Sequence, residues 1–192
     1  TFPRPGFLAA VKAEAAARGA VLIFDEVITG MRLGPRGAAG VFEVTPDLGV
    51  YAKALGSGWP VAAVAGRADL VELMSDGTTN HGGTYNGNAA AMAAVRATLE
   101  ELGDPSVYER VDEVGTELMR GLADAAGAAG VPVHIRGFPA AFFTHVTRGP
   151  TDPEPHRDLE PDTGRFTALV SRLRDGGVWV GGVRGNPQWH PS

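Results

Sequence analysis

Lys53 is the residue of this chain whose setting most suggests chemistry. Only two of the 17 basic side chains, Lys12 and Lys53, are lysines. Lys53 lies between apolar residues and a glycine turn, in the run from Asp47 to Gly58. Apolar neighbours disfavour the charged ammonium and leave a neutral amine, which is a nucleophile toward aldehydes. The hypothesis is a Schiff-base lysine; the alternative is a lysine whose stem lies along a sheet edge and whose head reaches water.

A carboxylate follows the first predicted strand. Residues 20–24 are apolar and predict a buried strand that ends in the acidic pair Asp25-Glu26. In α/β units, ligand-binding groups sit at the carboxyl ends of the strands, which is where Asp25 stands. The alternative for an isolated aspartate is a helix cap or a turn residue.

A polar, glycine-rich loop at residues 77–88 leads directly into a predicted helix. Backbone amides and a threonine hydroxyl just before a helix can bind an anion, so Thr84 is a candidate phosphate ligand. The alternative is an ordinary capped loop, because glycine-rich loops are frequent. His81, in the same loop, is interpreted as structural rather than as an acid or base.

The elements that must position these residues follow the rhythm of an α/β protein. In the first part of the chain they are a helix at 6–18, strands at 20–24, 48–52 and 61–66, the last also buried, a loop at 30–40, and helices at 69–74, capped by Asp69, and at 89–102. In the second part they are a helix at 107–129, strands at 131–136, 141–146 and 177–180, a helix at 163–175, and a proline-rich loop from Arg148. The patterns predict a partial large α/β domain at 1–103 and a smaller α+β domain at 104–192.

The composition of the chain indicates which classes of binding partner it can have. The net charge of -5 and the absence of a basic cluster give no case for nucleic acid, and no apolar run approaches the length of a membrane span. The chain has no cysteine, which excludes disulfides and thiolate metal sites and fits a reducing, cytoplasmic setting. We expect small-molecule partners and no metal site.

Three signals then stand in a fixed order along the chain. They are a strand followed by Asp25-Glu26-Val27, then Pro46-Asp47-Leu48 followed by Lys53, then Gly83-Thr84 ahead of Asn88 and a helix. Together they resemble the class III pyridoxal-phosphate-dependent aminotransferases, which have the type I fold, with a mixed, mostly parallel sheet in the large domain and a small C-terminal α+β domain. The stretches 58–61 and 81–88 are most similar to the glutamate-1-semialdehyde 2,1-aminomutase branch. The resemblance covers nearly the whole chain but only about the last half of a usual member.

The resemblance implies a role for each of these residues. Lys53 would hold the aldehyde of pyridoxal 5'-phosphate (PLP) and later move a proton between the substrate carbon and the cofactor. Asp25 would pair with the pyridine nitrogen and stay ionised, and Val27 would pack against one face of the ring. Thr84 would bind the phosphate of the cofactor held by a neighbouring subunit, which implies a homodimer.

The sequence also departs from the family pattern. Asn88 is followed by Ala89 rather than by proline, which is a convenience at a first helical position and matters little. The upstream half of the family carries a glycine/serine phosphate loop and an aromatic that stacks on the other ring face, and nothing in these residues replaces them. The family's last helix would follow Ser192. We therefore expect a piece of a longer protein; these residues alone should retain the cofactor weakly or not at all.

Four functional interpretations follow. The first is an aminotransferase acting between an amino acid or amine and a carbonyl compound; the second is an aminomutase, which exchanges the amino group within one molecule. The third is a non-catalytic remnant that keeps the fold. A nucleotide-binding domain that uses 56–58 as a phosphate loop is excluded, because no dinucleotide or P-loop pattern is present. Arg32 and Arg184 lie in loops suited to a substrate carboxylate, although a solvated surface position is favoured for each.

Overall fold

The computed structural model describes residues 2–149, 160–180, 182–183 and 186–189. The chain divides into two compact units, Pro3–Tyr108 and Glu109–Ser192, the second also taking in the first two residues. The division falls inside a helix, α5 (Pro105–Ala128). The domain boundary expected at residue 103 stays a prediction. The proline-rich loop lies mostly at 150–159, outside the described residues, as does Arg184.

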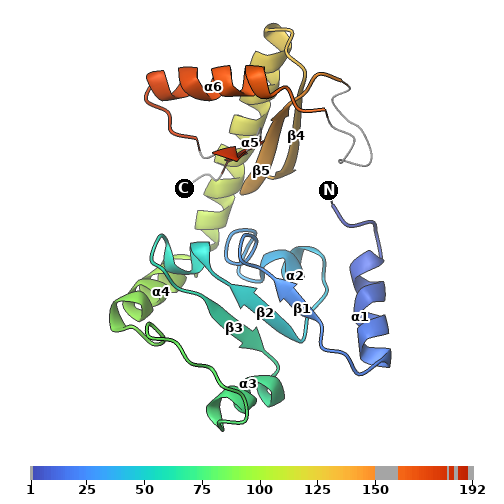
Figure 1. The fold of residues 1–192 in the computed structure, drawn as a ribbon, viewed down its shortest axis with the longest axis vertical. Coiled ribbons are helices and arrows are strands. Elements are labelled where there is room, and N and C mark those ends of the chain that lie inside the picture. The colour runs from blue at the N-terminus through green and yellow to red at the C-terminus, as the bar shows by residue number, and fades with distance from the viewer. Residues whose placement is uncertain (1, 150–159, 181, 184–185, 190–192) are drawn as a thin grey trace. The chain divides into compact units, whose positions relative to one another are not determined.

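The first unit is built on a three-stranded sheet with the order β1-β2-β3. Its strands are β1 (Ile23–Asp25), β2 (Leu48–Tyr51) and β3 (Ala63–Gly66). β1 runs parallel to β2, and β3 runs antiparallel to β2, as the arrows in Figure 1 show. The sheet is therefore mixed, and β2 is its central strand. This agrees with the predicted α/β class.

Helices connect and flank these strands. They are α1 (Phe7–Ala17), α2 (Gly37–Val41), the short 3₁₀ helix η1 (Lys53–Gly56), α3 (Ala68–Ser75) and α4 (Ala89–Glu101). The predicted helices at 6–18 and 89–102 are confirmed within a residue or so at each end. The expected loop at 30–40 is interrupted by α2, a single short turn of helix. Arg67, not Asp69, is the N-cap of α3; Asp69 lies in the first turn and forms an ion pair with Arg67 at 2.7 Å.

The predicted burial of the strands at 20–24 and 61–66 is wrong within the described structure. Ile23 is 54% exposed and Val64 is 39% exposed. The reason is topological: β1 and β3 each pair with β2 alone, so both are edge strands of this sheet. An apolar run indicates that a strand can be buried. Whether the strand is buried depends on the elements that pack next to it.

The second unit contains a four-stranded sheet, most of α5, and α6 (Thr163–Asp175). The strands are β4 (Val133–Phe138), β5 (Ala141–Val146), β6 (Gly182–Val183) and β7 (Asn186–Trp189), in the order β4-β5-β7-β6. Phe142, Val146 and Phe166 are buried and form part of the core of this unit. The predicted strand at 141–146 and helix at 163–175 are confirmed at both ends.

The predicted strand at 177–180 is wrong. Gly177 has a φ of 82°, which ends α6 in a turn, and the next three residues are irregular. Trp179 is 78% exposed, and the guanidinium of Arg174 lies 4.9 Å from the centre of its ring. A cation that covers the indole face offers this side chain an alternative to burial in a sheet. None of the helices in the described part of the chain is long and apolar enough to cross a membrane.

Candidate active site

Two adjacent carboxylates at the end of β1 have opposite environments. Asp25 is exposed, whereas Glu26 is 1% exposed. Among the residues that the structure describes, Asp25 Oδ1 accepts a hydrogen bond only from the Val27 amide, at 3.0 Å. Glu26 accepts hydrogen bonds from the backbone amides of Ala38 and Ala39, at 2.9 and 2.7 Å, and from the Thr29 hydroxyl. Of the two, only Asp25 has a carboxylate that a bound molecule could reach.

Lys53 follows β2 and begins η1. Its backbone φ is 48°, in the left-handed region that a residue with a side chain rarely adopts. Such backbone strain clusters at functional sites, which makes Lys53 a stronger candidate than its sequence position alone. The expectation that apolar neighbours bury the amine is wrong for the described structure, because Lys53 is exposed. The left-handed turn takes the chain out of the sheet, away from the apolar side chains of β2.

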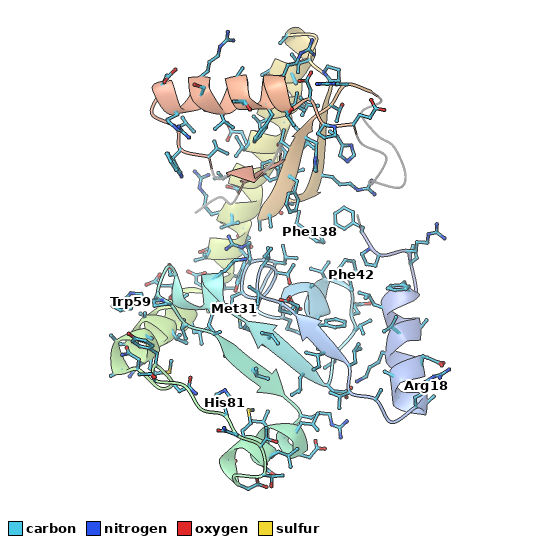
Figure 2. The ribbon with its side chains drawn as sticks, in the orientation of Figure 1. Arg18, Met31, Phe42, Trp59, His81 and Phe138 are labelled. Atoms are coloured by element: carbon cyan, nitrogen blue, oxygen red, sulfur yellow. The ribbon has the colours of Figure 1, made fainter. Side chains whose placement is uncertain are left out.

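Strand register brings Asp25 and Lys53 to one end of the sheet. In the parallel pair β1–β2, Asp25 lies opposite Val50, three residues before Lys53. Both residues therefore stand at the carboxyl ends of adjacent parallel strands, the place where α/β sheets bind ligands. Val27 follows at the same end and is partly buried. Figure 2 labels Met31 there, in the loop that continues from Val27.

The structure does not join Thr84 to this pair. Thr84 is exposed in a turn, and no hydrogen bond or ion pair connects its side chain to Asp25 or Lys53 among the residues described. Asn88 caps α4 through a hydrogen bond from the Ala91 amide at 3.1 Å. The expected helix after the loop is thus present, and the role of Thr84 as a phosphate ligand stays a prediction.

The loop that carries Thr84 borders an apolar cleft of about 870 Å³. Its walls come from β2, β3, α3, α4 and the loop, where His81 is labelled in Figure 2. His81 lies within 3.4 Å of the side-chain amide of Asn86, which agrees with the structural role expected for it. Asp25, Lys53 and Thr84 do not line this cleft. This cleft is therefore not the place where the candidate catalytic residues meet.

Sequence reasoning missed Asp47 as the ionic centre of the first unit. This buried carboxylate accepts hydrogen bonds from Lys12 Nζ at 2.9 Å, the Leu22 amide at 2.8 Å and Arg67 at 3.3 Å. It thereby ties α1, the start of β1 and the end of β3 to the base of β2. The sequence signal that could have indicated this ion pair was Lys12, one of only two lysines in the chain, whose ammonium pairs with Asp47.

These contacts lower the pKa of Asp47 to about 2, with the Leu22 amide as the largest cause and Lys12 the next. A carboxylate whose pKa is lower in the folded state stabilises the fold at pH values above its unfolded pKa. The contribution is complete above about pH 4 and is lost as the pH falls toward 2.

We therefore expect Asp47→Asn to destabilise the chain at neutral pH and to matter less as the solution becomes acidic. Urea denaturation of both proteins between pH 7 and pH 2 measures the difference. Asp124→Asn, an exposed aspartate on α5, is the control and should show no such pH dependence. A difference between wild type and Asp47→Asn that stays constant down to pH 2 would contradict this role of the carboxylate.

Arg32 is the one candidate for a substrate carboxylate that the structure describes. It is partly buried, so its side chain is less solvated than the surface position favoured for it from the sequence. Its Nε donates a hydrogen bond to the Ile28 carbonyl at 3.1 Å, and burial lowers the pKa of the guanidinium. No ion pair to Arg32 is found among the residues described. The guanidinium thus keeps donors available on the loop that begins at Val27.

Comparison with known proteins decides the family. The family model described as "Aminotransferase class-III" matches residues 1–187. The chain belongs to the class III aminotransferase family. Glutamate-1-semialdehyde 2,1-aminomutase of Desulforudis audaxviator is 39% identical to this class III chain over 179 residues, which are 93% of the chain and 41% of the relative. The protein of the same name from Syntrophobacter fumaroxidans is 48% identical over 146 residues, or 74% of the chain and 34% of that protein.

Solved structures agree with the type I fold. An omega-transaminase from Sphaerobacter thermophilus aligns with a TM-score of 0.83 at 28% identity, over 100% of this chain and 44% of that one. A structure described as a transaminase with PLP bound aligns with a TM-score of 0.81 at 26% identity, over 97% and 42%. This class III chain therefore spans about two fifths of the length of the relatives it matches.

Proposed function

We propose that this chain supplies the catalytic lysine and the pyridine-binding aspartate of a PLP-dependent aminotransferase. The reaction is the transfer of an amino group between an amino acid or amine and a carbonyl compound. One observation carries the proposal: an exposed amine and an exposed carboxylate stand at the carboxyl ends of two adjacent parallel strands, in register. Membership of the class III family supports the same chemistry.

The residues present fit the charge pattern of PLP. When bound, PLP supplies an aldehyde and a cationic ring that takes up electrons from the substrate. Asp25 offers a carboxylate that no cation of the described residues occupies, as a partner for the protonated ring nitrogen. Val27 would pack on the ring, and Thr84 would hold the phosphate of a neighbouring subunit.

Lys53 has two tasks in this proposal. Its Nζ would hold PLP through the aldehyde of the cofactor and give up that place to the substrate amine. As a neutral amine, Nζ would then accept a proton from the substrate carbon and return it. Exposure of Lys53 lets the substrate amine reach the same position.

An aminomutase is the second candidate, and a specific observation favours it. Three relatives that are 36–48% identical to this chain are named glutamate-1-semialdehyde 2,1-aminomutase, one of them with the added number 2. Incubation of the full-length protein with glutamate-1-semialdehyde, with and without an added amino donor, separates the two activities. Product formed without a donor supports the mutase, and product that requires the donor supports the transaminase. A chain that forms neither product and binds no PLP supports the third interpretation, a non-catalytic remnant.

The proposal includes a homodimer and a cytoplasmic setting. The dimer is expected because the phosphate ligand Thr84 is assigned to the neighbouring subunit's cofactor. The cytoplasmic setting rests on a chain without cysteine. Light scattering of the purified protein tests the homodimer, and fractionation of the source cells tests the cytoplasmic setting.

Reductive labelling tests the proposed chemistry. The chain is incubated with PLP, treated with borohydride, digested and analysed by mass spectrometry. We expect the pyridoxyl group on Lys53. Lys12 should remain unmodified, because its ammonium is paired with Asp47 at 2.9 Å. Labelling at Lys12 instead, or no label on a full-length protein, would remove the catalytic assignment.

Asp25→Asn should weaken binding of PLP without preventing the attachment to Lys53. A neutral amide cannot form the charge-assisted hydrogen bond to the protonated ring nitrogen, and such bonds contribute about 1.5–3 kcal/mol. The dissociation constant is expected to rise roughly tenfold or more, as measured by fluorescence titration. Glu43→Gln, at an exposed glutamate outside the site, is the control. Equal affinity in the wild type and Asp25→Asn would exclude the proposed pairing.

A further inference from the structure

Glu26 is the most buried charged side chain that the structure describes, and the proposed reaction does not use it. Its 1% exposure contrasts with the open carboxylate one residue earlier. Side chains alternate between the two faces of an extended strand. The end of β1 therefore presents Asp25 on one side and holds Glu26 on the other.

Every hydrogen-bonding group of Glu26 is engaged. Its carboxylate accepts from Ala38, Ala39 and Thr29. Its backbone amide donates to the Val50 carbonyl at 2.9 Å, and its carbonyl accepts from the Gly30 amide at 2.8 Å. The carboxylate charge also contributes, after burial, to a raised pKa of the Tyr51 hydroxyl. The residue thus connects β1, β2, α2 and the loop after Val27 at one point.

Two glycines make room for this arrangement. A Cβ on Gly37 would lie 2.5 Å from Glu26 Oε2, and a Cβ on Gly30 would lie 2.7 Å from the Glu26 carbonyl oxygen. Gly37 also has a φ of 55°, which favours glycine. The loop between them closes tightly around the Glu26 side chain, so its path depends on that carboxylate.

We propose that Glu26 is a positioning residue for Asp25. Its buried carboxylate fixes the backbone from Asp25 to Val27 against α2, so that the Asp25 carboxylate points to the ring nitrogen of PLP. The inference rests on the proposed function, because that gives Asp25 its partner. A functional carboxylate must be held to within about 0.5 Å by the residues that support it. The hydrogen bond from the Val27 amide to Asp25 Oδ1 is the observed contact that depends on this orientation of the carboxylate.

The test replaces Glu26 by glutamine in the chain as it stands. A glutamine fills the same volume, but its NH₂ group cannot accept a hydrogen bond from an amide. Amide hydrogen exchange is measured by NMR on the protein without cofactor. We expect exchange at Val27, Ala38 and Ala39 to become roughly tenfold faster or more, and exchange at the Leu22 amide, bound to Asp47, to stay unchanged. Glu43→Gln is the control.

PLP affinity is the second readout. Glu26→Gln should raise the dissociation constant for PLP, and the loss should be absent when the Asp25→Asn substitution is already present, because the two act through one contact. Thr29→Ala removes one donor to Glu26 and keeps the test possible if Glu26→Gln does not fold; it should give the same local pattern, more weakly. Unchanged exchange at Val27 would overturn the proposal, as would faster exchange throughout the chain or additive effects of the two substitutions.

Failure of the inference and failure of the proposed function give different results. If Lys53 of the wild-type full-length protein is not labelled by PLP and borohydride, the proposed function fails whatever the exchange data show. If Lys53 is labelled but Glu26→Gln leaves Val27 exchange and PLP affinity unchanged, Glu26 has no positioning role and the function stands.

Discussion

Lys53→Ala is expected to abolish reductive labelling by PLP while leaving the chain folded. Alanine has no amine, and the only other lysine is held in an ion pair with Asp47. Since the side chain of Lys53 is exposed and has no hydrogen-bond partner among the described residues, its removal breaks no contact of the fold. Labelling of side chains should therefore be lost completely, whereas the free energy of unfolding should change little.

Lys53→Gly separates the chemistry from the backbone strain. A residue with a Cβ at a φ of 48° costs about 1–2 kcal/mol in the left-handed region, and glycine does not. We expect Lys53→Gly to lose the label but to melt about 2–8 °C higher than Lys53→Ala. Circular dichroism melting curves measure the difference. A higher melting temperature of Lys53→Gly would show that the left-handed backbone at this position destabilises any residue with a Cβ, including the lysine.

Lys12→Arg is the matched control, because arginine keeps the positive charge beside Asp47 without a reactive amine. It should be labelled at Lys53 to the same extent as the wild type. A Lys53→Ala protein that still takes up one pyridoxyl group on a side chain, or a Lys12→Arg protein that takes up none, would contradict the assignment. Equal melting temperatures of the glycine and alanine variants would show that the backbone stores no strain at this position.

Gly115→Ala is expected to produce a large loss of stability in the second unit. Gly115 is buried on α5, and a Cβ there would lie 2.2 Å from the Pro139 carbonyl oxygen and 2.5 Å from its carbon. Both atoms belong to the backbone of the turn between β4 and β5, so no side chain can rotate away. Overpacking of this kind costs about 3 kcal/mol, and the melting temperature of the chain should fall by about 6–12 °C.

Gly121→Ala on the same helix is the control for Gly115→Ala. No atom lies within 4 Å of the added Cβ, so the substitution should instead stabilise α5 by about 0.5–1 kcal/mol. Thermal denaturation followed by circular dichroism distinguishes the two variants by the sign of the shift. Two small shifts of the same sign would mean that α5 can move away from the hairpin without loss of packing.

Much of the fold could be predicted from the sequence because its signals are local. The helices α1, α4 and α6 and the strand β5 follow from side-chain periodicity and from residues that begin or end an element, such as Asn88 before α4. The position of Asp25 after an apolar run, and of Lys53 after a second one, places both at strand ends. Parallel pairing of β1 with β2 then brings them to the same end of the sheet, as the register of these strands shows.

Other features depend on contacts between residues far apart in the sequence. An apolar strand does not reveal whether it lies at an edge, so the exposure of Ile23 and Val64 could not be predicted. The ionic centre at Asp47 joins residues 20 to 35 positions away, which no local pattern reports. The predicted strand at 177–180 is absent because Gly177 ends α6 in a turn, and Trp179 contacts Arg174 instead of packing in a sheet.

The sequence by itself determined the family, because residue types and their order carry that information, and it named Lys53 and Asp25 as the candidate amine and carboxylate. Only the tertiary structure showed how the environments of the two carboxylates at the end of β1 differ. Burial and three hydrogen-bond donors occupy Glu26, while exposure leaves Asp25 available. It also decided that Lys53 stands in a left-handed turn rather than against apolar side chains, since the path of the backbone after β2 depends on the packing of η1 and α4 around it.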